Sequence, residues 1–557
     1  MRKTTGILAL LLIVALPARA GTIRDVHLSY SHPDTATTMT MTWSTDSVAD
    51  PSAVRYGVDG NLDDQVSGES FQGNGELGAI HVVELTGLTP DTNYTYQVGG
   101  PGEWSATFGF RTATDEPCTP YRFVVLGDNR PDVEWLPQIH WNPILAESVD
   151  DNPLFMLHSG DIVKDGDQTG QWRTFFESSG HFLANTPFMA SIGNHDDGPG
   201  DGDGANYNQL FSYPRNSVTQ TEDYYFFTTA DAIFVSLSSQ TFNGGAIPFQ
   251  EQADWLDQVL TDNPRPWKIV VLHHPPYTSH LAFDLGFWDF EFNHGPNENG
   301  QNPALIPVFD KHHVDIVFAG HNHYYERFNP INAGPGPEQG TLSEGFHDGT
   351  VYVITGGAGA FVYDEYDIFG VDIDLISWVC GQATGSEVCS GKHHFVSVTI
   401  NGPSLTYEAI SSAEQTFGND PSNVELLDSF IIIKAGEGIC PDPPDPELVP
   451  EPSPEPTSDV VEAPDVVQEE VFSPDIPADA PATPDTQVKP DIPSSAPDTG
   501  GNAEIPGAET APDPAPIQPG TDGARSGGCA AAPTSAPLGF LLLLFAMAVF
   551  RRKQRSS

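Results

Sequence analysis

Basic residues are scarce in this sequence, which carries 23 Lys and Arg against 76 Asp and Glu and a formal net charge of −53. A surface that binds nucleic acid needs clustered Lys and Arg, so this balance argues against that class of partner. Residues 441–524 hold nineteen acidic residues and one base, a balance of −18, which leaves −35 for the rest of the chain. An anionic ligand would be repelled at long range, and a bound metal ion would have to supply the local attraction.

Long apolar runs are also missing. Residues 538–550 form a run of thirteen, whereas a membrane-spanning helix needs about twenty. With GGC at 527–529 in front and RRKQR at 551–555 behind, residues 527–557 resemble the MYXO-CTERM sorting tail of exported myxobacterial proteins. That resemblance implies processing at Cys529, and a simple membrane anchor with cytoplasmic Arg residues is the alternative. Either tail would tether the protein at the cell surface or outer membrane.

The first twenty residues have the three parts of an export signal. Arg2 and Lys3 form a basic start, residues 7–16 an apolar core, and residues 18–20 (ARA) a small-x-small cleavage site. A buried N-terminal helix is the alternative, but charge, length and cleavage site agree with export.

Cysteine is rare, with five residues in the chain: Cys118, Cys380, Cys389, Cys440 and Cys529. An exported protein meets oxidising conditions, in which cysteines pair. Cys380 and Cys389 lie nine positions apart in a loop with Gly and Ser, and we expect them to form a disulfide. Cys118 and Cys440 bracket the central region and would staple its ends, with two free thiols as the alternative.

Residues 22–114 read as strands throughout, with β-rich runs at 38–43, 81–85 and 106–111. Short strands separated by turn residues predict a β-sandwich. The stretch 85–98, LTGLTPDTNYTYQV, resembles the corner of a fibronectin type III-like domain. We expect this domain to pack against the next one and to carry no chemistry.

Strand-like and helix-like runs alternate over residues 121–434, which predicts an α/β layered domain. Apolar spacing typical of helices occurs at 133–149, 249–261 and 303–312, and later strands are predicted at 351–359 and 395–405. The following stretch, 440–526, holds twenty-one of the fifty prolines. It has too little apolar surface to offset chain entropy, so we expect a disordered, extended stalk.

Five short polar blocks recur in the central region, and four of them end a run of apolar, strand-forming residues. They are 124–128 (VVLGD), 158–161 (HSGD), 192–195 (IGNH), 270–273 (VVLH) and 318–323 (FAGHNH). Carboxylate, amide and imidazole donors suit Mn, Fe or Zn. Side chains that follow buried strands lie at the ligand-binding edge of α/β sheets. Five such blocks at one edge would hold two metal ions, as in a metal-dependent hydrolase.

The order GD, GD, GNH(D), H, GHxH resembles that of the calcineurin-like metallophosphoesterase superfamily, and its details resemble purple acid phosphatase-like members. Residues 320–327, GHNHYYER, are close to that family's GHVHAYER, residues 193–196 match its GNHE with Asp for Glu, and residues 273–277, HHPPY, resemble its HxPWY. The resemblance covers residues 22–435. It implies a four-layer αββα sandwich of two mixed sheets over 118–435, behind the fibronectin type III-like domain of the larger family members.

The resemblance also implies two metal ions, Fe, Mn or Zn, and a ligand for each matching position. Asp161 corresponds to the carboxylate that bridges both ions. Asp128 and His323 would complete the first site, and the second would be completed by Asn194, His273 and His321. His273 fits better than His274, because the family ligand is followed by one residue and then Pro.

Two positions depart from the family. Purple acid phosphatases place a metal-bound Tyr three residues after the bridging Asp, where this chain has Lys164, so we expect no purple tyrosinate colour. Other calcineurin-like enzymes use Asp-x-His in the first block, where this chain has Arg130. Neither cationic side chain is a metal ligand, so the first site would lack one protein ligand. Arg130 would clamp a phosphate oxygen or pair with a neighbouring carboxylate.

The implied reaction is hydrolysis of a phosphomonoester by a metal-bridging hydroxide that attacks phosphorus in line. His195 resembles the family's proton donor to the leaving alkoxide. His280 lies in a loop where relatives carry another substrate-facing His, although the spacing differs. Tyr324 and Tyr325 would stack on an aromatic leaving group or pack internally, and His393 and His394 are expected to be surface or packing residues.

Together these features predict an exported, surface-tethered, acid phosphatase-like enzyme acting on small phosphate esters. A phosphodiesterase or nucleotidase with the same site is one alternative, because loop shape around the metals decides between ester classes. A non-catalytic surface-binding protein on a degenerate phosphoesterase scaffold is another. The missing first-site ligand favours it, but seven site residues remain: Asp128, Asp161, Asn194, His195, His273, His321 and His323.

Overall fold

The computed structural model describes residues 22–131, 140–196, 205–239, 248–279, 301–332, 338–339, 349–362, 365–368, 371–374, 376, 380–381, 383, 385–412 and 424–434. All of them belong to one compact unit. The expected export signal, stalk and sorting tail lie outside the described residues, as do Cys440 and Cys529. Within the described part of the chain, no helix is long and apolar enough to cross a membrane.

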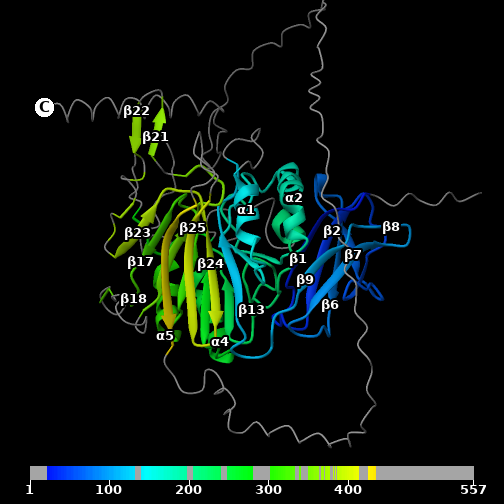
Figure 1. Ribbon diagram of the computed structural model, residues 1–557, viewed down its shortest axis with the longest axis horizontal. Helices are drawn as coiled ribbons and strands as arrows, with labels where there is room; N and C mark the ends of the chain where they lie inside the picture. The colour runs from blue at the N-terminus through cyan, green and yellow to red at the C-terminus, as the bar shows by residue number, and fades with distance from the viewer. Residues whose placement is uncertain are drawn as a thin grey trace, which may run out of the picture. The chain divides into compact units, whose positions relative to one another are not determined.

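The N-terminal strands, blue in Figure 1, form the predicted β-sandwich. One sheet has the order β1 (Arg24–Ser29), β2 (Met39–Thr45), β6 (Ala79–Leu85), β5 (Glu69–Gln72), and a short 3-10 helix, η1 (Gly75–Leu77), precedes β6. The other has the order β4 (Asp64–Ser67), β3 (Ala53–Val58), β7 (Asn93–Gly100), β8 (Glu103–Trp104), with β9 (Phe108–Arg111) also paired to β7. The alternation of Thr with Met and Trp in β2 fits a strand with apolar residues on one face.

The sandwich packs against the α/β domain, as expected. All seven residues of β2 are buried, and the hydroxyl of Thr42 lies 3.1 Å from that of Ser212 in the second domain. Tyr96 donates a hydrogen bond to the carbonyl of Ala184 at 2.6 Å. These contacts join residues that are more than 80 positions apart, so the two domains share a buried interface.

A six-stranded mixed sheet forms the first half of the α/β domain. Its order is β12 (Phe188–Ala190), β11 (Met156–His158), β10 (Tyr121–Leu126), β24 (His394–Asn401), β25 (Ser404–Ser411), β26 (Leu426–Ile433). The first three strands are parallel, and β24 to β26 form an antiparallel meander that is yellow in Figure 1. Helices α1 (Trp141–Val149) and α2 (Thr169–Leu183) cover this sheet, with Trp141 edge-on to His158 and Phe175 against Phe188.

A seven-stranded mixed sheet forms the second half. Its order is β13 (Tyr225–Thr228), β14 (Ala232–Ser236), β15 (Trp267–Val271), β16 (Ile316–Ala319), β20 (Val351–Thr355), β17 (Tyr325–Phe328), β23 (Ser386–Ser390). Strands β14, β15, β16 and β20 run parallel. Helices α4 (Phe249–Asp262) and α5 (Gln301–His312) pack on it through one apolar cluster, while α3 (Asn206–Leu210) is a short helix near the sandwich. Two small ribbons pair β18 (Ile331–Asn332) with β19 (Glu338–Gln339) and β21 (Glu365–Ile368) with β22 (Val371–Asp374).

The two sheets pack face to face through aromatic contacts. Phe123 of β10 meets Phe234 of β14 edge-on at 5.1 Å between ring centroids, and Phe318 of β16 stacks on Tyr407 of β25 at 6.3 Å. With helices on both outer faces, the arrangement is the expected four-layer αββα sandwich. The fold prediction is therefore confirmed.

Some element boundaries differ from those expected. The strand predicted at 395–405 is a hairpin, in which Gly402, with φ of +54°, turns the chain between β24 and β25. Of the helix predicted at 133–149, α1 covers 141–149 and residues 132–139 lie outside the described part. Helices α4 and α5 match their predicted ranges to within two residues. The disulfide between Cys380 and Cys389 is present. Cys118 is also disulfide-bonded.

Candidate metal centre

Each of the five polar blocks follows one of the parallel strands. Asp128, Asp161 and Asn194 come after β10, β11 and β12, which are parallel neighbours in the six-stranded sheet. His273 and His321 come after β15 and β16, parallel neighbours in the facing sheet. Because the carboxyl ends of parallel strands share an edge, the topology brings all five blocks together.

Three of these residues have left-handed backbone conformations, which are rare for residues other than Gly. The φ angles of Asp128, Asp161 and His321 are +57°, +59° and +69°. Such conformations are costly and concentrate at functional sites. The glycines beside them permit close packing: a Cβ on Gly320 would lie 2.3 Å from Oδ2 of Asp128, and one on Gly193 would lie 2.2 Å from the backbone nitrogen of Asp161.

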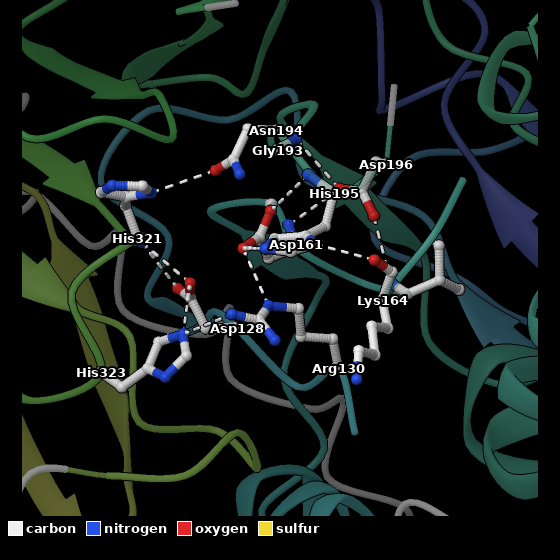
Figure 2. A network of polar contacts seen from close by, with 12 residues as sticks. Asp128, Arg130, Asp161, Lys164, Gly193, Asn194, His195, Asp196, His321 and His323 are labelled. Carbon is white, nitrogen blue, oxygen red and sulfur yellow. Dashed lines mark hydrogen bonds and ion pairs between the residues drawn. The ribbon is translucent and has the colours of Figure 1, made fainter. Parts of the chain in front are cut away.

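One group of donors consists of Asn194, His273 and His321, hereafter the amide–imidazole cluster. Oδ1 of Asn194 lies 2.9 Å from Nε2 of His273 and 3.0 Å from Nδ1 of His321. The two ring nitrogens are 3.3 Å apart. Figure 2 shows the Asn194 amide directed at the His321 ring. Nε2 of His273 also lies 3.2 Å from Oδ1 of Asp161.

These atoms face one another as acceptors. The Nδ1–H of His273 donates to the carbonyl of Ser159 at 2.8 Å, which leaves Nε2 with a lone pair. Burial lowers the pKa of His273, so the ring is neutral at neutral pH. Nε2 of His273 thus presents a lone pair to the lone pairs of Oδ1 of Asn194 and Oδ1 of Asp161, and a cation between these atoms would stabilise the arrangement. Ligand atoms about 2.0–2.1 Å from one ion lie roughly 3.0–3.4 Å apart, so this donor set fits a metal ion.

The second group of donors consists of Asp128, Asp161 and His323, hereafter the carboxylate cluster, whose ligand atoms lie within 4.8 Å of one another. The Nδ1 of His323 donates to the carbonyl of Phe361 at 2.9 Å, and its Nε2 lies 3.6 Å from Oδ1 of Asp128. Burial, with a smaller contribution from the nearby Arg130 charge, lowers the pKa of His323 to about 3, so the ring is neutral and its Nε2 carries a lone pair.

Asp161 joins the two clusters. Its Oδ1 faces His273 of the amide–imidazole cluster, and its Oδ2 lies on the side of the carboxylate cluster, where it accepts a hydrogen bond from Nε of Arg130 at 3.1 Å. Burial raises the pKa of Asp161, but the neighbouring His273, His195 and Arg130 side chains, of which Arg130 carries a permanent charge, outweigh burial and hold the pKa low. The carboxylate is thus ionised, with one oxygen directed at each cluster.

The guanidinium of Arg130 lies inside the carboxylate cluster, as Figure 2 shows. Besides Oδ2 of Asp161, it contacts Nε2 of His323, which is 3.4 Å from Nη2. Of the two roles expected for Arg130, pairing with a neighbouring carboxylate is the one present in the structure. Its side chain is largely buried, with 14% exposed.

The ring of His195 lies next to Asp161, with Nε2 4.0 Å from Oδ2. Its Nδ1 donates to the carbonyl of Lys164 at 2.7 Å, which fixes the ring orientation and leaves Nε2 directed at the centre. Burial lowers the pKa of His195, whereas the Asp161 carboxylate opposes that shift. About a third of the side chain is exposed, so a ligand can reach it.

Asp196 has a role that the sequence analysis did not assign. Its buried carboxylate accepts four backbone N–H groups, those of Asp161 (2.8 Å), Ile162 (2.8 Å), Val163 (3.1 Å) and Gly193 (2.9 Å). Burial, followed by repulsion from Asp161, raises the pKa of Asp196 to about 8. The family motif matched this position to Glu, but only the folded chain shows that the side chain clamps the loop that carries Asp161.

The remaining predicted residues have the following places. His274 lies near His273 and His321 as a possible further ligand, and its Nδ1 is 2.9 Å from the hydroxyl of Ser239. His280 lies outside the described residues. Tyr324 and Tyr325 are buried, so they pack internally. His393 and His394, which were expected to be surface or packing residues, are buried packing residues.

The chain is similar to several known proteins. Residues 23–112 match the family "Purple acid Phosphatase, N-terminal domain", and residues 119–325 match the family "Calcineurin-like phosphoesterase". "Purple acid phosphatase 21" of Arabidopsis thaliana is 30% identical over 346 residues, 58% of this chain and 71% of the relative. "Acid phosphatase type 7" of Mus musculus is 29% identical over 61% of this chain and 78% of the relative. The structure of purple acid phosphatase PPD1 from yellow lupin has a similar fold, with a TM-score of 0.57, 20% identity and 74% of each chain covered.

Proposed function

The chain belongs to the purple acid phosphatases, and we propose that it is an exported, surface-tethered phosphomonoesterase. Membership of this family makes it a metal-dependent hydrolase of phosphate esters with a dinuclear metal centre. The observation that carries the proposal is that Nε2 of His273, which has a lone pair and no proton, lies 2.9 Å from Oδ1 of Asn194 and 3.2 Å from Oδ1 of Asp161. A cation bound between these atoms would compensate their lone pairs.

The ligands divide between the two clusters. The carboxylate cluster would hold the first ion through Asp128 and His323, and the amide–imidazole cluster would hold the second. Asp161 would bridge them, because its two oxygens face different clusters. The donor set of carboxylate, amide and imidazole suits Fe, Mn or Zn. When bound, the ions would acidify a water molecule and neutralise charge on the phosphoryl oxygens.

Two side chains of this chain would act on the substrate directly. Nε2 of His195 is oriented by the Lys164 carbonyl, and in the imidazolium form, in which both ring nitrogens carry a proton, it would donate a proton to the leaving oxygen of the ester. The planar guanidinium of Arg130 suits a phosphate oxygen, and its position beside Asp161 supports that role. His280, which lies outside the described residues, remains a further proposed substrate contact.

Turnover of matched esters tests the proposed reaction. With 4-nitrophenyl phosphate and bis(4-nitrophenyl) phosphate at saturating Mn²⁺, Fe²⁺ or Zn²⁺, we expect the monoester to have the higher kcat/KM. Asp161→Asn should abolish hydrolysis of both, because the bridging charge is lost. A diester that reacts faster than the monoester would reject the monoesterase and identify a phosphodiesterase. An Asp161→Asn variant with the wild-type rate would reject the bridging role.

Export and tethering are proposed from the termini, residues 1–20 as a signal peptide and residues 527–557 as a sorting or anchor tail. Residues 22–114 and 118–435 would then form the exported body, and residues 440–526 the stalk that holds it away from the surface. The disulfide between Cys380 and Cys389 supports an oxidising compartment. Fractionation of producing cells tests this: the wild type should be in the surface or outer-membrane fraction, and Cys529→Ala or a chain ending at residue 526 should leave it. An unchanged distribution would contradict tethering by the tail.

A further inference from the structure

The two clusters differ in what satisfies their lone pairs. In the amide–imidazole cluster, Oδ1 of Asn194 lies 2.9 Å and 3.0 Å from ring nitrogens of His273 and His321, and among the described residues no Lys or Arg contacts this Asn194 oxygen or the His273 nitrogen. In the carboxylate cluster, the Arg130 guanidinium donates to Oδ2 of Asp161 at 3.1 Å and contacts Nε2 of His323 at 3.4 Å. One cluster offers its lone pairs to a metal ion, and the other shares them with a fixed cation.

We propose that Arg130 and the first metal ion compete for the carboxylate cluster, so that the second ion binds tightly and the first binds weakly and exchangeably. This inference rests on the proposed two-ion site and adds the order in which it fills. A lone pair that accepts from a guanidinium N–H is not available to a metal ion. Oδ2 of Asp161 keeps a second lone pair, but Nε2 of His323 has only one, so the first ion gains its His323 ligand only when Arg130 moves away from that nitrogen.

Electrostatic repulsion between Arg130 and the first metal ion acts in the same direction as their competition for lone pairs. A guanidinium keeps its charge at every pH at which the protein folds. It would repel a divalent ion a few ångströms away in a site where Asp128, Asp161 and His323 are buried. The backbone holds Arg130 in place, since its N–H donates to the carbonyl of Asp161 at 3.1 Å, so only the side chain can move aside. Besides its proposed contact with the phosphate, Arg130 thus sets the affinity of the first ion.

Metal binding to the full chain tests this without any ester present. Protein stripped with a chelator is titrated with Mn²⁺ by calorimetry, and metal retained after desalting is measured by mass spectrometry. We expect the wild type to show two classes of site and to retain close to one equivalent. Arg130→Ala should tighten the weaker class roughly tenfold or more, and Arg130→His, which adds a ligand, should tighten it further.

Lys164→Ala is the matched control, because it removes a cation from the same region while its carbonyl still holds His195. We expect both of its affinities to equal those of the wild type. Arg130→Gln removes the charge but keeps a polar side chain of similar length, and it replaces Arg130→Ala if that variant unfolds. Two equal sites in the wild type, or an unchanged weaker site in the Arg130 variants, would overturn the proposal. Failure to hydrolyse monoesters would reject the proposed function and leave this result unaffected.

Discussion

The carboxylate of Asp196 accepts the backbone N–H of Asp161 at 2.8 Å, so one buried acid fixes the position of another. The N–H groups of Ile162, Val163 and Gly193 complete the contact. Asp161 has a φ of +59°, a conformation that a non-glycine residue keeps only when its surroundings impose it. Asp196 supplies that constraint from 35 positions further along the chain.

Replacement of Asp196 by Asn should therefore reduce kcat by more than the accompanying loss of stability explains. The amide nitrogen of Asn cannot accept, so two of the four N–H groups lose their acceptor and the Asp161 loop shifts. We expect a decrease of about 2 kcal/mol in the free energy of unfolding and a fall in kcat on the order of tenfold or more. Chemical denaturation and 4-nitrophenyl phosphate turnover measure the two effects.

Asp231→Asn provides the control for that experiment. Asp231 is also buried and accepts one backbone N–H, that of Cys118 at 2.7 Å, but it lies away from the metal centre. This variant should lose stability and keep its kcat per folded molecule. If Asp196→Asn behaves in the same way, Asp196 has no positioning role in catalysis.

His195→Gln should discriminate between esters by their leaving groups. The Lys164 carbonyl orients the ring, and Nε2 is the atom available to protonate the departing oxygen. We expect kcat for an alkyl phosphate to fall on the order of a hundredfold, and kcat for 4-nitrophenyl phosphate, whose leaving group departs without a proton, to fall much less. Equal losses for both esters would show that His195 binds substrate rather than acting as an acid.

His273→Ala and His274→Ala separate two adjacent candidates for metal ligation. Nε2 of His273 lies 2.9 Å from Oδ1 of Asn194 and 3.2 Å from Oδ1 of Asp161, whereas Nδ1 of His274 is occupied by the hydroxyl of Ser239 at 2.9 Å. We expect His273→Ala to lose the tightly bound equivalent of Mn²⁺ in elemental analysis. His274→Ala should retain it, and loss of the ion in His274→Ala alone would exchange the two assignments.

The blocks that form the candidate site can be recognised in the sequence because each lies next to a strand. Each proposed ligand follows a buried strand within a few positions, so strand-forming residues and polar donors occur together. Helices α4 and α5 could also be predicted from the sequence, because their apolar residues recur on one face. By contrast, the hairpin between β24 and β25 was missed, although Asn401, Gly402 and Pro403 are typical of a turn.

The contacts of Arg130 and Asp196 were not predictable, for a physical reason. Each contact joins residues about thirty or more positions apart, Arg130 with Asp161 and His323, and Asp196 with the 161–163 loop. Nothing in the local sequence encodes which carboxylate a guanidinium reaches or which N–H groups a carboxylate accepts. Those partners depend on strand order and register, which the motif alone does not specify.

Stability should fall in acid because His394 is buried as a neutral ring. Its Nδ1 donates to the carbonyl of Lys392 at 2.8 Å, and its Nε2 lies 3.1 Å from the hydroxyl of Thr355. Burial lowers the pKa of His394 from 6.5 to about 4. Between these values the unfolded chain binds the proton and the folded chain does not, so the free energy of unfolding decreases as pH falls.

His394→Gln removes this titration. The difference in unfolding free energy between pH 7 and pH 5 should become smaller than in the wild type by about 2 kcal/mol. Guanidinium chloride denaturation at both pH values measures it. His313→Gln, at an exposed histidine at the end of α5, should show the wild-type difference. An unchanged difference in His394→Gln would mean that the ring is protonated in the folded protein.

The ion pair between Arg327 of β17 and Asp428 of β26 should stabilise the fold without contributing to catalysis. Both side chains are buried, Nη2 of Arg327 lies 3.1 Å from Oδ1 of Asp428, and Tyr325 donates to Oδ2 at 2.7 Å. Asp428→Ala would leave the guanidinium buried without its carboxylate, which should cost about 3–5 kcal/mol of unfolding free energy.

Arg327→Met combined with Asp428→Leu tests whether that cost comes from the isolated charge. Because the double variant removes both charged groups and fills their volume, it should recover most of the lost stability. Strand β17 begins two residues after His323, so any effect of the pair on the metal centre would appear in the kcat of the folded double variant. We expect that kcat to equal the wild-type value. A double variant as unstable as Asp428→Ala would show that the hydrogen bonds of the pair, rather than compensation of a buried charge, hold β17 to β26.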